Sequence, residues 1–135
     1  MANIKILLVD DDPDLIIAVQ TILENKGYEV VAAYNKKEGL ELLLTEKPDL
    51  AILDVMMEGT HDGFELARAI KQIPEYEKLP IIMLTSVDSI TGVNFKAAMS
   101  DPNWLPADEY IDKPVEPNDL IETIEQVLAA KADKR

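Results

Sequence analysis

Short runs of apolar residues recur along this chain, and a polar residue follows each of them closely. The runs cover residues 4–9, 50–53 and 81–84, with a shorter one at 110–111. A continuous apolar run bounded by polar residues is typical of a strand that is buried on both faces. Such strands belong to parallel sheets covered by helices on both sides. The pattern therefore predicts a parallel sheet at the centre of the fold.

The polar residues that follow these runs are acidic, hydroxylic or basic. They are Asp10 and Asp11, Asp54, Thr85 and, one position later, Lys113. In open parallel sheets, ligands bind outside the carboxyl ends of the strands. If the runs are neighbouring strands, these five residues converge on one crevice, although they are far apart in the sequence.

The segments between the apolar runs have the spacing of amphipathic helices. The first helix is expected to begin at Asp12-Pro13, where a capping carboxylate precedes the one helical position that tolerates proline. Gly27 should end this helix, and a second strand is expected at 29–33. Asp12 is accordingly interpreted as a helix cap and not as a third metal ligand.

The second helix is expected to follow a capping box formed by Asn35 and Glu38, and to end at Lys47-Pro48. Further helices are expected around residues 64–70, 89–99 and 120–128. Strands and helices thus alternate five times. This alternation predicts the α/β class, with a doubly wound, five-stranded parallel sheet and helices on both faces.

Length and composition indicate one domain over residues 1–135. The chain can bury a sizeable core, but it is too short for a second domain beside five strand–helix units. It has no cysteine, which excludes disulfides and thiolate chemistry. No apolar run approaches the roughly 20 residues that span a bilayer. We therefore expect a cytoplasmic protein that does not contact the membrane.

The formal net charge of −13 at pH 7 limits the classes of partner. So much negative charge repels phosphate backbones, and direct nucleic-acid binding is not expected. The expected partners are other proteins.

The expected cluster has the composition of a phosphoryl-transfer site. Three carboxylates held together repel one another unless a cation lies among them. An all-oxygen set with few protein ligands suits Mg²⁺, which commonly completes its shell with water and phosphate oxygens. A threonine hydroxyl and a lysine ammonium could contact the same phosphoryl group from other sides. Asp54 is the best candidate for the acceptor, since the paired Asp10 and Asp11 are better placed to hold a metal.

Five motifs run through the whole chain in an order that matches a known family. They are Val9-Asp10-Asp11 and the segments 53–57, 62–66, 83–86 and 110–114. In these motifs the chain resembles the receiver domains of bacterial two-component response regulators. The resemblance implies a flavodoxin-like fold of five βα units, with strand order 2-1-3-4-5.

The resemblance also implies roles for individual residues. Asp54 would accept a phosphoryl group from a sensor histidine kinase or a phosphotransfer protein. Asp10, Asp11 and Asp54 would hold Mg²⁺, and the backbone carbonyl of Met56 would complete the metal shell.

The resemblance further implies a switch around the phosphorylated site. Thr85 and Lys113 would bind the phosphoryl group, and Thr85 and Tyr110 would change position with it. The protein would be a signalling domain that promotes only its own phosphorylation and dephosphorylation. It would act on a downstream protein that the sequence does not identify, as a monomer or as a phosphorylation-dependent dimer.

Two segments depart from the pattern of the family. The loop 58–63 is one residue longer than usual and lacks the proline that usually follows the Met-Met pair. A second segment, 101–106, carries Trp104 and is inserted ahead of the last strand. The output surface is therefore the part that the resemblance predicts least.

Other functional classes fit the sequence less well. A phosphatase of the haloacid dehalogenase type would use the spacing of Asp10 and Asp12, but Asp14 stands where that class has a hydroxyl residue. A flavodoxin-like cofactor binder would need a glycine- or hydroxyl-rich phosphate loop after the first strand. The main alternative is a receiver-like interaction module that works without phosphorylation.

Overall fold

The computed structural model describes residues 4–54, 62–85, 109–112 and 115–133. The strands are β1 (Lys5–Val9), β2 (Glu29–Ala33), β3 (Leu50–Asp54), β4 (Ile81–Thr85) and β5 (Glu109–Asp112). The helices are α1 (Pro13–Asn25), α2 (Lys36–Glu46), α3 (Asp62–Gln72) and α5 (Pro117–Asp133), with a 3-10 turn, η1, at Pro74–Tyr76. The helix expected at 89–99 and the segments 58–61 and 101–106 lie outside the described residues.

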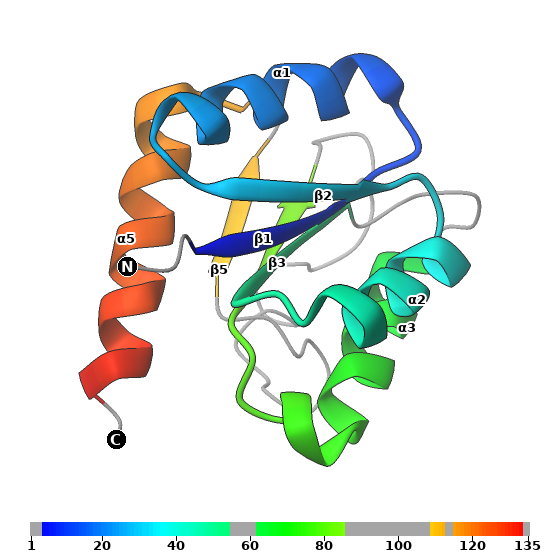
Figure 1. The fold of residues 1–135 in the computed structure, drawn as a ribbon. Helices are drawn as coiled ribbons and strands as arrows, with labels where there is room; N and C mark the ends of the chain where they lie inside the picture. The colour runs from blue at the N-terminus through cyan, green and yellow to red at the C-terminus, as the bar shows by residue number, and fades with distance from the viewer. Residues whose placement is uncertain (1–3, 55–61, 86–108, 113–114, 134–135) are drawn as a thin grey trace, which may run out of the picture.

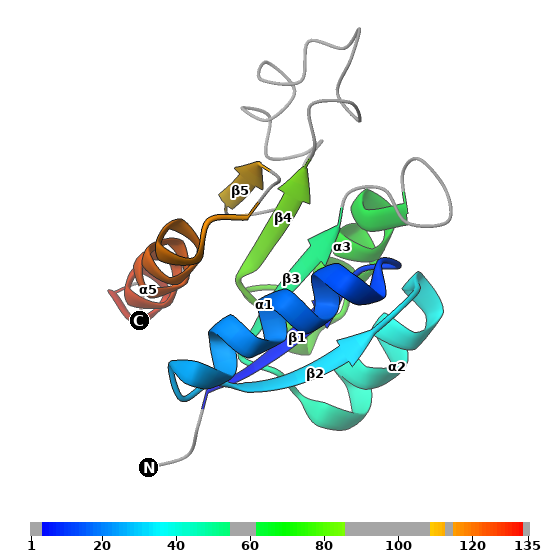
Figure 2. The same cartoon turned by 90° about the horizontal axis from the view of Figure 1, so that it is seen from above.

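The strands form one parallel sheet in the order β2-β1-β3-β4-β5. Both the predicted fold class and the predicted strand order are confirmed. Strands β1 and β3, which precede the predicted site residues Asp10 and Asp54, are buried along almost their whole length. Helices α1 and α5 lie on one side of the sheet and α2 and α3 on the other, which gives three layers (Figures 1 and 2).

Alternate residues of each central strand supply two separate cores. Leu7 and Val9 of β1 pack into the core beneath α2 and α3, whereas Ile6 and Leu8 pack into the core beneath α1 and α5. This division follows from the two-residue repeat of a strand, whose successive side chains point to opposite faces. The near-continuous apolar runs of the sequence therefore serve both faces of the sheet.

The helix termini agree with the capping pattern expected from the sequence. The Asn35 side chain accepts a hydrogen bond from the Glu38 N–H at 2.8 Å. The Glu38 carboxylate reaches back to the N–H of Tyr34, at 3.0 Å. In a typical capping box the acid bonds the N-cap residue itself, so the box is present but shifted by one residue. Helix α1 ends at Asn25, and the positive φ of 89° at Gly27 turns the chain towards β2.

A glycine inside α2 allows this helix to lie close to the sheet. Gly39 is buried, and a Cβ atom at this position would come within 3.0 Å of side-chain atoms of Val9 and Leu66. Separations this short require neighbours to move, so a larger residue would displace α2 from β1 or α3. Val9 immediately precedes Asp10, which links the packing of α2 to the carboxyl end of β1.

Within the part of the chain that the structure describes, no helix is both long and apolar enough to cross a membrane.

We expect Tyr76→Phe to lower the free energy of unfolding by about 1 kcal/mol, the usual net value of one hydrogen bond. The Tyr76 hydroxyl is buried and donates to the Leu43 carbonyl at 3.1 Å, which ties η1 to α2. The loss of stability should not be larger, because the Leu43 carbonyl keeps a second partner in the variant. It also accepts a hydrogen bond from the Lys47 N–H at 3.2 Å. Chemical denaturation at neutral pH measures the change, with the more exposed Tyr34→Phe as the control. Equal losses in the two variants would contradict it.

The same variant should respond differently to alkali. Burial raises the pKa of Tyr76 above its ordinary value of 10.0, and Glu75 adds to the effect. The folded state therefore holds this proton more tightly than the unfolded state. The stability that the protonated Tyr76 hydroxyl contributes is fully present below the pKa of this group in the unfolded chain. It is lost as the pH rises through the higher pKa of the group in the folded protein. The stability of Tyr76→Phe should consequently fall less steeply with pH above about 10 than that of the unaltered protein.

Candidate metal and phosphoryl-acceptor site

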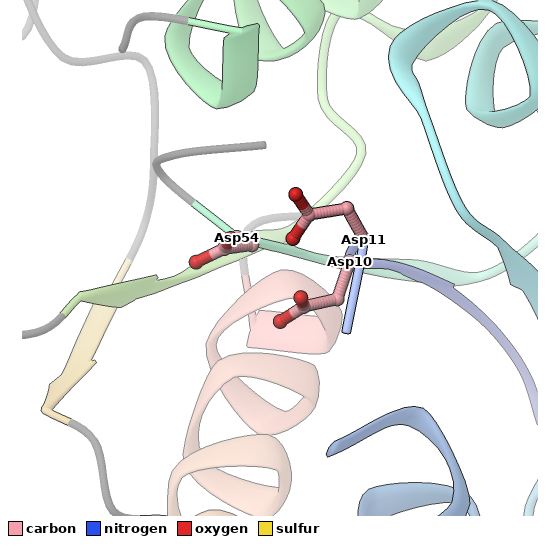
Figure 3. A group of neighbouring side chains, drawn as sticks. All are labelled: Asp10, Asp11 and Asp54. Atoms are coloured by element: carbon pink, nitrogen blue, oxygen red, sulfur yellow. The ribbon is translucent and has the colours of Figure 1, made fainter. Parts of the chain in front are cut away.

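The register of the sheet brings three carboxylates together at the carboxyl ends of β1 and β3. Val9 lies opposite Leu53, so Asp10 and Asp54 each follow one of a pair of neighbouring residues. One carboxylate oxygen from each of Asp10, Asp11 and Asp54 lies within 4.8 Å of the other two. Figure 3 shows the three side chains grouped at these strand ends. The predicted convergence of the three acids is confirmed.

Two of the three acids are removed from solvent. Asp10 is 0% exposed and Asp54 is 5% exposed, whereas Asp11 is exposed. Burying a carboxylate is costly unless hydrogen bonds or an opposite charge compensate for the lost hydration. Like charges at this distance add repulsion to that cost. The arrangement therefore favours a bound cation.

The donor set fits a hard divalent ion. All three side chains offer oxygen, which is the donor that Mg²⁺ and Ca²⁺ prefer. One oxygen of each acid already lies within 4.8 Å of the others, so Asp10, Asp11 and Asp54 are the described residues that would hold such an ion.

The turn after β1 is fixed at several points. The Asp10 N–H donates to the Ala33 carbonyl of β2 at 3.1 Å. Asp10 Oδ1 accepts a hydrogen bond from the Asp12 N–H at 2.9 Å. The side chain of Asp12 caps α1, as predicted, by accepting from the N–H of Asp14 at 3.0 Å and from that of Leu15 at 3.5 Å.

The hydrogen bond from the Asp12 N–H to Asp10 is not among the features predicted from the sequence. An Asp side chain that accepts the N–H two residues on forms an Asx-turn, which is common where a strand gives way to a turn. The spacing of the two acids was therefore the available signal. The same two-residue spacing also fits a phosphatase of the haloacid dehalogenase type, so it does not by itself specify an Asx-turn.

The other predicted site residues are described to different extents. Leu84 lies opposite Asp54, so Thr85 is one position further along at the adjacent strand end. Tyr110 lies opposite Met83, is half-buried, and packs against the core beneath α2 and α3. Met56 and Lys113 lie outside the described residues.

Sequence comparison matches this chain to the response regulator receiver domain over residues 6–125. Protein PilH of Pseudomonas aeruginosa is 34% identical over 128 residues, which cover 93% of this chain and 98% of PilH. The alkaline phosphatase synthesis transcriptional regulatory protein PhoP of Bacillus subtilis is 36% identical over 132 residues. That match covers 93% of this chain but 49% of PhoP, so the similarity is to about half of that protein.

Structural comparison agrees with the sequence match. The receiver domain protein (CheY-like) of Methanospirillum hungatei superposes with a TM-score of 0.82 at 30% identity. The match covers 99% of this chain and all of the other. The similarity therefore extends over the whole sheet and the helices on both of its faces.

We expect Asp11→Asn to raise the free energy of unfolding in the absence of divalent ions. The substitution removes one of three crowded charges, and two unit charges about 4 Å apart interact by about 1 kcal/mol in a medium like water. Denaturation in a chelator measures the gain. Glu41→Gln is the control, because it removes one exposed charge in α2 without altering the cluster. A lower stability for Asp11→Asn than for the control would contradict the inferred repulsion.

Proposed function

Because this chain belongs to the response regulator receiver domain family, we propose that it accepts a phosphoryl group on Asp54 during two-component signalling. The observation that carries this proposal is the position of Asp54. It is nearly buried at the end of the middle strand, within 4.8 Å of two further acids. We further propose that residues 1–135 form one receiver domain, since the family match spans 6–125 and α5 continues to Asp133.

Asp54 is better placed as the acceptor than either of its acidic neighbours. It lies on β3, with β1 on one side and β4 on the other, so groups from both strands flank it. Asp10 is held by the Asp12 N–H, and Asp11 lies at the exposed rim. These two suit the holding of a metal, whereas Asp54 stands between the metal-binding side and the strand end that carries Thr85.

In the proposed reaction, a carboxylate oxygen of Asp54 attacks the phosphorus of a phosphohistidine on a sensor kinase or phosphotransfer protein. An O–P bond forms, the P–N bond breaks, and the electron pair of that bond returns to the imidazole. Bound Mg²⁺ would supply charge neutralisation at the phosphoryl oxygens. Asp10 and Asp11 orient the reacting groups, which is the main contribution that phosphoryl transfer requires from the protein.

The remaining roles stay predictions from the family resemblance. They are metal binding by the Met56 carbonyl, phosphoryl binding by Thr85 and Lys113, and a switch formed by Thr85 and Tyr110. The downstream partner, a phosphorylation-dependent dimer and the cytoplasmic location are predictions as well. The alternative of a receiver-like module that works without phosphorylation is not favoured, because the three acids and the family match occur together.

We expect Asp54→Ala to abolish phosphorylation. The unaltered protein, incubated with Mg²⁺ and a small acyl phosphate, should gain one phosphoryl group as measured by intact mass, and a chelator should prevent the gain. Asp14→Ala is the control, since it removes an exposed acid from the same end of the molecule. Uptake by Asp54→Ala at the rate of the unaltered protein would show that the acceptor is another residue.

We also expect Mg²⁺ affinity to fall as the pH is lowered from neutral to mildly acidic. Carboxylates bind a metal in their deprotonated form, so protons compete with the ion for the cluster. Isothermal titration calorimetry at several pH values measures the effect, and Asp11→Ala should bind more weakly throughout. An affinity that stays constant over this range would indicate that the three carboxylates do not share one ion.

A further inference from the structure

Asp12 links the acidic cluster to the first helix through bonds made by two parts of the same residue. Its side chain caps α1 through the N–H groups of Asp14 and Leu15. Its own N–H donates to Asp10 Oδ1 at 2.9 Å. The orientation of one buried carboxylate in the cluster therefore depends on a peptide group whose position is set by the start of a helix.

We propose that Asp12 is a positioning residue that raises the affinity of the cluster for a divalent cation without binding the ion. By capping α1 it fixes the peptide that orients Asp10 relative to Asp11 and Asp54. This inference rests on the proposed function, since it concerns the same metal site. It extends that function by assigning a role in metal binding to a residue outside the cluster.

Backbone hydrogen bonds hold both ends of the turn between β1 and α1. Between these ends, the side chain of Asp12 sets the conformation of the chain. The Asp10 N–H is bonded to Ala33 of β2, and the Asp12 carbonyl accepts the first helical bond, from the Ile16 N–H at 3.1 Å. Asp12 has the extended conformation of an N-cap residue, with φ −94° and ψ 106°. Without its side-chain oxygen, the first turn of α1 loses an acceptor, and the Asp11–Asp12 peptide, whose N–H donates to Asp10, is held less firmly.

Asp12 could also attract a cation through its charge alone, and the choice of variants separates the two effects. Asn and Ser cap helices about as well as Asp, so Asp12→Asn and Asp12→Ser remove the charge and keep the cap. Asp12→Ala removes both. Asp14→Asn is the matched control for charge, because Asp14 is exposed in the same turn and bonds Asp12 through its backbone N–H.

The test measures the Kd for Mg²⁺ alone by calorimetry, together with the free energy of unfolding of each variant in a chelator. Asp12→Ala should bind Mg²⁺ roughly fivefold more weakly than Asp14→Asn, a factor equivalent to about 1 kcal/mol. Asp12→Asn and Asp12→Ser should lie within about twofold of Asp14→Asn, because they preserve the cap. Rescue by these two variants is the result that a pure charge effect would not give.

A second variant covers the case in which Asp12→Ala folds poorly. Glycine at an N-cap costs only a few tenths of a kcal/mol in helix stability, yet it removes the side-chain acceptor. Asp12→Gly should therefore stay folded and, because it also lacks the acceptor that fixes the turn, should bind Mg²⁺ about as weakly as Asp12→Ala.

Two results would overturn the proposal, and they differ in whether the proposed function also fails. If the unaltered protein binds Mg²⁺ and both Asp12→Ala and Asp12→Gly bind it as tightly as Asp14→Asn, Asp12 is a helix cap only and the proposed function stands. If the unaltered protein binds no Mg²⁺, the proposed metal site and the role of Asp12 both fail.

Discussion

The repulsion among three carboxylates at one end of the sheet is the constraint to which the rest of the structure responds. Asp10 and Asp54 are almost entirely buried, and Asp11 lies within 4.8 Å of them. Such a cluster opposes folding unless the remainder of the fold compensates for it. Two apolar cores, one on each face of the sheet, supply that compensation. The fold thus keeps in place a group of negative charges that a bound cation can neutralise.

At the opposite end of the sheet, where no metal site is proposed, acidic side chains are arranged differently. At the start of β1, the Lys5 ammonium lies 3.2 Å from the carboxylates of both Glu29 and Glu46. These partners raise the pKa of Lys5, because they stabilise its charged form. Two acids near the amino end of β1 are therefore matched by a cation of the protein, whereas the donor set of the cluster at the carboxyl ends fits a divalent ion.

The turn between β1 and α1 joins local and non-local structure over a few residues. Asp12 and Pro13 begin the helix by local rules of capping and backbone geometry. The Asp12 N–H also holds Asp10, which the sheet has brought beside Asp54. A residue that begins a helix can in this way act on a site that two neighbouring strands assemble. On the strand side of this turn, Val9 packs closely against Gly39 of α2, which limits how far the end of β1 can move.

The sequence by itself determined the features that depend on near neighbours along the chain. The apolar runs specified buried strands, Asp12 and the Asn35–Glu38 pair specified helix starts, and the acids after two runs specified a shared site. Strand order was predicted only through the family resemblance, because the choice of neighbours in a sheet depends on how distant segments pack. Packing also decided the Tyr76 bond to Leu43, the approach of α2 at Gly39, and the Asp12 bond to Asp10. Each of these depends on positions in space that only the tertiary structure sets, since an Asx-turn or a close helix contact is one of several conformations that its local sequence permits.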